Sequence, residues 1–201
     1  MRDSIRQNRQ TLKKLFDSIV ATNAQGIPFL AEEAIENAIG IIMEHAQSGG
    51  KILLIGNGGS AAIASHIATD FWKNAGIKAT AFNDSALLTC LSNDLGYKHV
   101  FEKSVEMFAD PKDVLIAISS SGQSENILRA VAAARVKDLR VITYSGFKAD
   151  NPLRSKGEIN FYVPASHYGH VEVLHHSLCH CLIDIIIEHK AKLMEKAQSH
   201  E

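Results

Sequence analysis

The 201-residue sequence has few cysteines and no strong charge of either sign. Its three cysteines, Cys90, Cys179 and Cys181, form no CxxC pair and leave one over, so neither a disulfide framework nor a thiolate zinc site is expected. The formal net charge is −1 and no block of lysine and arginine occurs, which argues against direct nucleic-acid binding through bulk electrostatics. With 46% hydrophobic and 21% charged residues, the chain is expected to be globular.

Long apolar runs are also missing. None approaches the ~18–20 residues that a membrane helix needs. The first ten residues, MRDSIRQNRQ, lack the apolar core of a secretory signal. We therefore expect a cytoplasmic protein without a membrane partner.

The first 48 residues have a helical pattern on both sides of a break at residues 26–28. Residues 3–22 space their apolar side chains by three and four, which predicts an amphipathic helix. Residues 29–47 predict a second helix, so that two helices precede the first strand. The apolar positions of the first helix are Ile5, Leu12, Leu15, Phe16, Ile19 and Val20. A lone amphipathic helix must bury this face, either in a self-associated bundle, which we expect, or against its own core.

From residue 51 onward, short apolar runs alternate with helical stretches. Strands are predicted at 51–55, 114–118 and 139–144, with weaker candidates at 78–82 and 159–163. Helices are predicted at 60–73, 85–92, 99–109 and 124–136, and a last long helix begins near Val171. This alternation predicts an α/β fold, a flavodoxin-like three-layer sandwich with a mostly parallel sheet and additional N-terminal helices. We expect a single domain over 1–201, comprising a helical segment at 1–48 and a βα core with a C-terminal helix at 49–201.

Two loops of small residues follow predicted strands, where an open parallel sheet binds its ligands. The first, at 56–61, reads GNGGSA and suits either a plain tight turn or a close approach to a ligand. The second, at 119–124, reads SSSGQS. Its hydroxyls and the amides of the following helix form a donor-rich cradle for a phosphate, although Ser124 alone could be an N-cap of a simple turn.

The sequence is rich in histidine, with ten residues, six of them between His167 and His189. His66 and Asp70 are four residues apart on one predicted helix, which suits half of a metal site or a buried structural pair equally well. Glu172, His176 and His180 recur every four residues on the last helix and form a polar stripe. No role is assigned to His175, which lies off this stripe, or to His189 and His200, which are expected to be exposed.

Taken together, GNGGSA, His66, Ser-Asn-Asp at 92–94 and ISSSGQS at 118–124 resemble the sugar-isomerase (SIS) domain family. Within that family, the chain is similar to the sedoheptulose 7-phosphate isomerases, also called phosphoheptose isomerases, over nearly its whole length. The resemblance implies an intramolecular oxidoreductase that converts sedoheptulose 7-phosphate through an enediol to D-glycero-D-manno-heptose 7-phosphate. The product would supply lipopolysaccharide or related surface glycans, and the enzyme would be a homotetramer.

The resemblance also implies the site residues. Asp70 is the implied catalytic base and His180 the acid or partner base. The implied ligands of zinc or a similar divalent ion are His66, Asp70, Glu172 and His180. The implied substrate contacts are Asn57, Gly58, Gly59, Ser60, Asp70, Asn93, Asp94, Ser119, Ser120, Ser121, Ser124 and Glu172. For Asn93 and Asp94, the composition is equally typical of a plain turn.

Two positions depart from the family pattern, which has glutamate at Asp70 and glutamine at Glu172. The shorter base is retracted by about 1 Å, and a displacement of that size can cost about 10²-fold in rate. The added carboxylate at 172 would strengthen binding of a divalent metal.

Helix geometry indicates another candidate metal ligand. In a regular helix Glu172 and His180 lie roughly 12 Å apart along the axis. One ion could bind both only if Glu172 preceded the regular helix or if residues came from another subunit, so His176, about 6 Å from His180, is the rival ligand.

Two alternative functions stay open from the sequence. The departures at 70 and 172 would suit a non-catalytic SIS protein that binds a partner, as one family member binds the bacterial replication initiator protein. An isomerase for another phosphosugar is the third option, because no residue fixes the length of the sugar.

Overall fold

The computed structural model describes residues 1–198, so that His200 lies outside the described residues. In chain order, the elements are α1 (Arg2–Asp17), β1 (Val20–Thr22), β2 (Pro28–Phe29), α2 (Ala31–Gln47), β3 (Ile52–Gly56), α3 (Gly59–Lys73), β4 (Ala79–Ala81), α4 (Ser85–Leu95), the 3₁₀ helix η1 (Tyr97–His99), α5 (Val100–Phe108), β5 (Val114–Ser119), α6 (Glu125–Val136), β6 (Arg140–Ser145), the 3₁₀ helix η2 (Pro152–Ser155), β7 (Ile159–Tyr162) and α7 (Tyr168–Gln198).

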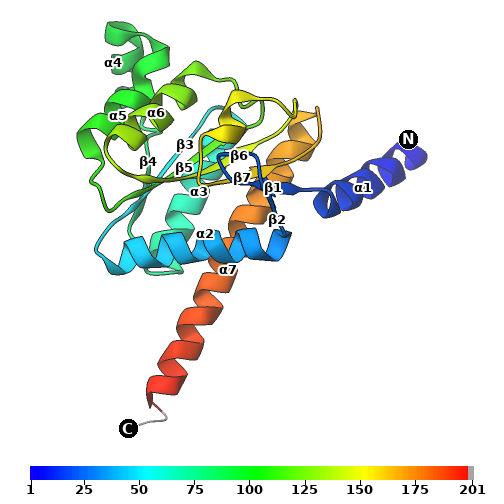
Figure 1. The fold of residues 1–201 in the computed structure, drawn as a ribbon. Coiled ribbons are helices and arrows are strands. Elements are labelled where there is room, and N and C mark those ends of the chain that lie inside the picture. The colour runs from blue at the N-terminus through cyan, green and yellow to red at the C-terminus, as the bar shows by residue number, and fades with distance from the viewer. Residues whose placement is uncertain (199–201) are drawn as a thin grey trace.

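The strands of the described residues form one seven-stranded sheet in the order β2-β1-β7-β6-β5-β3-β4. The five strands from β7 to β4 are parallel, whereas β1 pairs antiparallel with both β7 and β2. Helices cover both faces of the sheet (Figure 1). The α/β fold with a mostly parallel sheet, predicted from the alternating pattern, is confirmed.

The apolar strands are buried on both faces because each face packs against a separate layer of helices. Side chains of α2, α3 and α7 form one core against the sheet. Side chains of α5 and α6 form a second core on the other face. Alternate residues of a strand point to opposite faces, so Leu54 belongs to the first core and Leu53 and Ile55 to the second.

The prediction of one helix over residues 3–22 is wrong at its C-terminal end. Helix α1 ends at Asp17, and residues 20–22 form a short strand whose central residue, Ala21, pairs with Phe161 of β7. Phe29, predicted to begin the second helix, lies instead in β2. Two short strands therefore separate the first two helices. The physical reason is that the open edge of β7 presents backbone groups that an added strand can satisfy.

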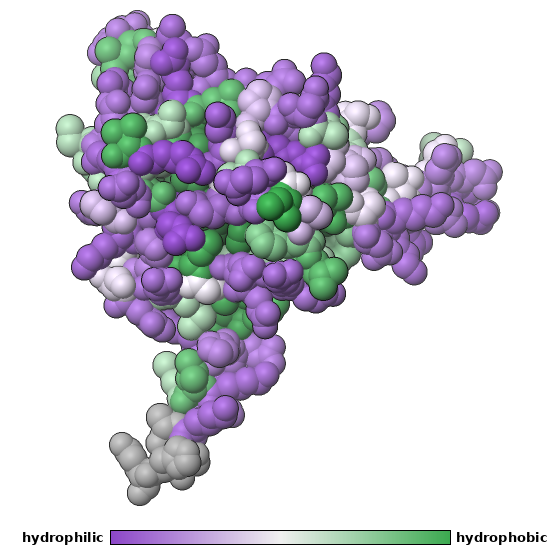
Figure 2. Space-filling view, in the orientation of Figure 1, coloured by the Kyte–Doolittle hydropathy of each residue, from purple (hydrophilic) through white to green (hydrophobic). Residues whose placement is uncertain are grey.

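Helix α1 projects from the body of the molecule (Figure 1) and has no buried residue. Figure 2 shows that the face of α1 turned toward the viewer is largely hydrophilic. Leu12 and Leu15 are partly buried against the start of α7, while Ile5 and Phe16 remain 54% and 47% exposed. Packing of α1 against the core of its own chain therefore covers only part of the apolar face of the helix.

Helix α7 is the longest described helix, with 31 residues, and its C-terminal turns extend beyond the body (Figure 1). By length and composition alone, its segment Tyr168–Lys196 could cross a membrane, but 44% of the most apolar window is buried within the protein. Leu178, Leu182 and Ile186 of this helix belong to the first core. These contacts are those of a core helix.

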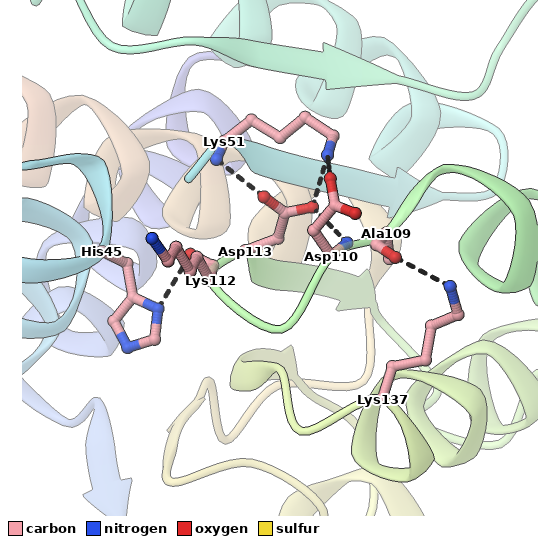
Figure 3. Close-up of polar contacts among 7 residues, drawn as sticks. All are labelled: His45, Lys51, Ala109, Asp110, Lys112, Asp113 and Lys137. Carbon is pink, nitrogen blue, oxygen red and sulfur yellow. Dashed lines mark hydrogen bonds and ion pairs between the residues drawn. The ribbon is translucent and has the colours of Figure 1, made fainter. Parts of the chain in front are cut away.

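A polar network joins the amino ends of β3 and β5, opposite the two loops (Figure 3). Asp113 is 1% exposed, and its carboxylate accepts hydrogen bonds from the backbone amides of Lys51 and Asp110. The Lys51 Nζ donates to Asp113 at 2.6 Å and to Asp110 at 3.0 Å. Burial lowers the pKa of Lys51, but hydrogen bonds to the two carboxylates outweigh it and raise the pKa above its usual value.

We expect Asp113→Ala to destabilise the fold by about 2 kcal/mol, because it removes a buried carboxylate that three donors share. The partly exposed Lys51 keeps access to water, which limits the loss. Asp110→Ala is the matched control, since Asp110 binds the same lysine but is 78% exposed, and it should cost less than about 1 kcal/mol. Urea unfolding of both variants measures the difference; equal losses would contradict the role given to burial.

Candidate functional site

The two small-residue loops lie side by side at the carboxyl edge of the sheet. The first loop follows β3 and the second follows β5, and these strands are neighbours, with Gly56 in register with Ile118. Each loop leads into a helix, α3 or α6, whose first amides have no intrahelical partner. The structure therefore brings two candidate ligand loops and two helix N-termini to one place, as ligand binding in open α/β sheets requires.

The second loop is tightly folded around its hydroxyls. The Ser119 Oγ accepts the backbone N–H of Gly122 at 3.2 Å, and the Ser121 Oγ accepts that of Gln123 at 3.2 Å. Gly122 has φ +63°, and a Cβ there would lie 2.0 Å from the Asn151 Oδ1, so only glycine fits. The Ser120 Oγ is buried and has no protein partner among the described residues. Ser124 lies at the N-cap of α6 without a capping side-chain bond.

The first loop is equally close-packed. A Cβ on Gly56 would lie 2.5 Å from the backbone of Ser60, which is itself 3% exposed in the first turn of α3. Gly58 has φ +54° and is the N-cap of α3. The loop therefore needs glycine for its turn as well as for any ligand that approaches its backbone.

Asn57 links the first loop, in which it lies, to α6, the helix that follows the second loop. Its side chain exchanges two hydrogen bonds with that of Asn126 in α6, both at 2.9 Å. The hydroxyl of Tyr97, in η1, donates to the Asn57 Oδ1 at 2.8 Å. The residue predicted to contact the sugar is thus fixed by groups from α6 and η1.

An acid–base cluster joins α3 to α7. The Asp70 Oδ2 lies 3.3 Å from the His66 Nε2 and 3.6 Å from the His180 Nδ1. The other carboxylate oxygen, Oδ1, accepts a hydrogen bond from the Asn74 Nδ2 at 3.1 Å. The Asp70 side chain is 16% exposed, whereas those of His66 and His180 are 51% and 39% exposed. A largely buried carboxylate between two imidazoles can accept a proton and pass it on.

Three histidines in this cluster could hold a metal ion. One ring nitrogen each of His66, His176 and His180 lie within 4.8 Å of one another. The rings of His176 and His180 are 4.6 Å apart by centroid, and both rings lie about 5 Å from that of His66. The His176 Nε2 is buried and has no hydrogen-bond partner among the described residues. A buried nitrogen without a hydrogen-bond partner, beside two other imidazoles, fits the donor set of a metal site.

The electrostatics of His176 agree with a ligand role. Burial lowers its pKa, and the neighbouring His180 and His66 lower it further, against the opposing effect of Asp70. A lowered pKa keeps the imidazole neutral near pH 7, which is the form that binds a metal.

Glu172 lies outside this histidine cluster. Helix α7 is continuous through residues 172–180, so Glu172 is two turns from His180 on the same regular helix. Its carboxylate lies against Gly59 at the start of α3, where a Cβ would be 2.4 Å from it. Of the four residues implied as metal ligands, the structure brings together His66, Asp70 and His180, and the rival His176 joins them.

Asn93 and Asp94 are not in a turn, because α4 continues to Leu95 rather than ending at residue 92. Both side chains are exposed, and the Asn93 Nδ2 donates to the Asp94 Oδ1 at 2.8 Å. The turn alternative for this pair is therefore wrong. Both residues lie on the solvent-exposed last turn of α4.

Among the remaining histidines, His175 is completely buried and its Nε2 donates to the Ser145 carbonyl at 3.0 Å, while His189 is exposed as expected. Asn126, Tyr97, Asn74 and Asn151 were not singled out from the sequence. Asn126, Tyr97 and Asn74 each donate a side-chain hydrogen bond to a predicted site residue, and Asn151 packs against Gly122 of the second loop. The only available signal was the i,i+4 spacing of Asn74 from Asp70.

The chain resembles known proteins over most of its length. Residues 9–146 match the model of the SIS domain. The chain is 37% identical over 172 residues to a phosphoheptose isomerase from Proteus mirabilis, covering 82% of this chain and 86% of the relative. Solved structures of phosphoheptose isomerases from Francisella tularensis and Neisseria gonorrhoeae superpose with TM-scores of 0.82 and 0.80, at 28% and 29% identity. These matches cover 94% and 92% of this chain and 98% and 97% of those chains.

Proposed function

This chain belongs to the SIS-domain family and, within it, to the phosphoheptose isomerases, and from that membership we propose that it interconverts sedoheptulose 7-phosphate and D-glycero-D-manno-heptose 7-phosphate. The observation that carries the proposal is the Asp70 carboxylate held between His66 and His180, on the helix that follows the first ligand loop. The product would enter surface-glycan synthesis in the cytoplasm. The proposal places this activity in a single SIS domain over residues 1–201.

The serine loop receives the phosphate. Ser119, Ser120, Ser121 and Ser124 supply hydroxyls, and the first amides of α6 supply N–H donors to an anion that brings its own charge. The orphaned, buried Ser120 Oγ supports this role, because a phosphate oxygen would satisfy it. Anchoring the phosphate here leaves the sugar to extend toward the first loop, over Asn57, Gly58, Gly59 and Ser60, and toward Asn93, Asp94 and Glu172.

Asp70 moves the proton. Its carboxylate takes the proton from C1 of the ketose, which gives the enediol, and returns it to C2 to give the aldose. The hydroxyl proton meanwhile passes from the C1 oxygen to the C2 oxygen, with His180 as the group that serves these oxygens. The Asn74 amide, bonded to the other oxygen of Asp70, holds the carboxylate in place without occupying the atom that faces the histidines.

The cluster suits zinc or a similar divalent ion. Three imidazoles are a common ligand set for catalytic zinc, and the mutual distances of their nitrogens fit one ion. His66, His176 and His180 would hold the metal, with Asp70 adjacent, and Glu172 would contribute only if it came from another subunit. When bound, such an ion polarises a sugar oxygen as a Lewis acid.

We expect purified protein to bind about one divalent ion per chain, and His176→Ala to weaken its affinity at least about 100-fold, because one of three imidazole ligands is lost. Glu172→Gln is the matched control on the same helix and should leave the affinity unchanged. Elemental analysis and competition with a coloured chelator measure both. If only the Glu172 variant lost affinity for the metal, Glu172 would be the ligand and His176 would not.

The protein assembles through α1 into a homotetramer. The exposed apolar residues of a helix that projects from the body support this part of the proposal, since self-association would bury them. Light scattering measures the mass directly, and a monomer would refute it.

The deciding experiment for the function is turnover of sedoheptulose 7-phosphate by the metal-loaded protein, followed as aldose formation. If the protein turned over only a shorter phosphosugar, it would still be an isomerase, but for a different substrate. Absence of both turnover and metal would replace the enzyme by a partner-binding SIS protein.

A further inference from the structure

Asn57, a residue implied to contact the sugar, is held by other side chains on two sides. Asn126, which anchors it from α6, is 4% exposed, and Tyr97 reaches it from η1. Neither residue has a place in the reaction described above. Their contacts join three chain segments that are distant in sequence, since Asn57 is 40 residues from Tyr97 and 69 from Asn126.

The orientation of these amides is fixed by a backbone group. The N–H of Ile127 donates to the Asn126 Oδ1 at 3.0 Å, and a backbone N–H can only donate. The oxygen of Asn126 therefore faces that amide, and the same oxygen accepts from the Asn57 Nδ2. The Asn126 Nδ2 in turn donates to the Asn57 Oδ1, so the Tyr97 hydroxyl, which reaches the same oxygen, must be a donor.

This arrangement uses up the acceptor capacity of Asn57. A carboxamide oxygen accepts two hydrogen bonds, and those of Asn126 and Tyr97 fill both places. Of the two N–H groups on Nδ2, one donates to Asn126 and the other has no partner among the described residues. Asn57 can therefore offer a ligand one donor and no acceptor.

We propose that Asn126 and Tyr97 are positioning residues that hold Asn57 as a dedicated hydrogen-bond donor to an oxygen atom of the phosphosugar. The inference rests on the proposed isomerase function. A carboxamide held with its N–H toward the ligand favours an oxygen that gains negative charge, as the sugar oxygens do when the enediol forms. It disfavours a hydroxyl that must itself donate a hydrogen bond. Because only Gly96 separates Tyr97 from the end of α4, its hydrogen bond also ties the segment that carries Asn93 and Asp94 to the first loop.

The geometry can be tested without any substrate. In ligand-free, metal-loaded protein, the side-chain amide signal of Asn57, observed by ¹⁵N NMR, should shift in both Tyr97→Phe and Asn126→Asp. The first change removes one donor to its oxygen; the second replaces a donor by an acceptor while keeping the acceptor for Ile127. An unchanged Asn57 signal in both variants would overturn the proposal whatever the enzyme turns over.

The consequence is tested by kinetics. Asn57→Ala should lower kcat/KM by about 10²-fold, as loss of a donor to a developing oxyanion does. Tyr97→Phe should lower it about 5-fold, for one neutral hydrogen bond, and Asn126→Asp about 10- to 100-fold, for a misplaced donor. In the Asn57→Ala background, either change should add less than about a twofold loss, because both residues act through Asn57.

Tyr162→Phe is the matched control, since it removes a hydroxyl that donates to the Phe147 carbonyl at 2.9 Å outside the site. It should leave kcat and KM unchanged, and thermal unfolding should place all variants within about 4 °C of the wild type. Additive losses in the double variants would assign Tyr97 and Asn126 a merely structural role and overturn the inference. A wild-type protein without turnover, but with the expected NMR shifts, would instead refute the proposed function and leave the donor geometry standing.

Discussion

Asp70→Ala should lower kcat for sedoheptulose 7-phosphate by about 10³-fold, because it removes the only carboxylate that lies between the two histidines His66 and His180 in the described structure. KM should change much less, since the phosphate is held by the serine loop. The measurement is a steady-state assay of aldose formation with metal supplied at saturation. Saturating metal is needed because loss of the neighbouring carboxylate also lowers the affinity of the site for the metal ion.

Two further variants separate the charge of Asp70 from its shape. Asp70→Asn keeps the size and the bond from Asn74 but cannot accept the proton, and its kcat should fall as far as that of Asp70→Ala. Asp70→Glu keeps the base and extends it by one methylene, so its kcat should stay within about tenfold of the wild type or exceed it. Wild-type kcat in the asparagine variant would remove Asp70 from the role of base.

The parallel core of this fold was predictable from the sequence because its strands are buried on both faces. Runs such as Val114–Ser119, with every residue buried, need no alternation of polar and apolar side chains and stand out from the helical stretches. The edge strands β1 and β2 were missed for the opposite reason. They have three and two residues, and Val20 also continues the helical spacing of Leu12 and Phe16, so local pattern favoured a longer helix.

The site was predictable where its spacing is local. His66 and Asp70 are one helical turn apart on α3, and the structure places their side chains 3.3 Å apart. The meeting of α3 with His176 and His180 of α7 depends on tertiary packing across more than 100 residues, which helix periodicity cannot supply. Distances along the last helix nevertheless identified His176 as the residue in range of His180, and the ring contact of 4.6 Å agrees with that reasoning.

The polar bridge between Asn57 and Asn126 had no local signal at all. Both residues are of a type that is common in turns and at helix starts, so each had an adequate local explanation. Only the adjacency of β3 and β5, which brings the two loops together, reveals that they pair. Long-range polar pairs of this kind cannot be predicted from the local pattern of a single sequence.

The second large effect is expected in the pH dependence of folding, through His175. Burial lowers the pKa of this completely buried side chain to about 4, against a smaller opposing effect of its hydrogen bond to the Ser145 carbonyl. Its Nε2–H donates to that carbonyl, and the Nδ1 is buried with no partner among the described residues, so the ring is held neutral. In the unfolded chain the same imidazole titrates near pH 6.5.

The sign follows from where the proton binds. Below pH 6.5 the unfolded chain takes up a proton that the folded protein refuses until about pH 4, so the free energy of unfolding rises with pH across this window. The contribution of His175 is complete above pH 6.5 and is lost as the pH falls toward 4; the size of the loss is about 3 kcal/mol, at about 1.4 kcal/mol per pH unit.

The measurement is the free energy of unfolding in urea at pH 4.5, 5.5, 6.5 and 7.5, for the wild type and for His175→Gln, with a chelator present so that metal release by the neighbouring histidines does not contribute. Carboxylates that titrate in the same window affect both proteins equally, so the difference between the two curves isolates His175. The wild type should lose its advantage over the variant steadily below pH 6.5, because glutamine carries no proton to gain. Parallel curves would show that His175 takes up its proton in the folded state as readily as in the unfolded chain, and the buried ring would then be open to water.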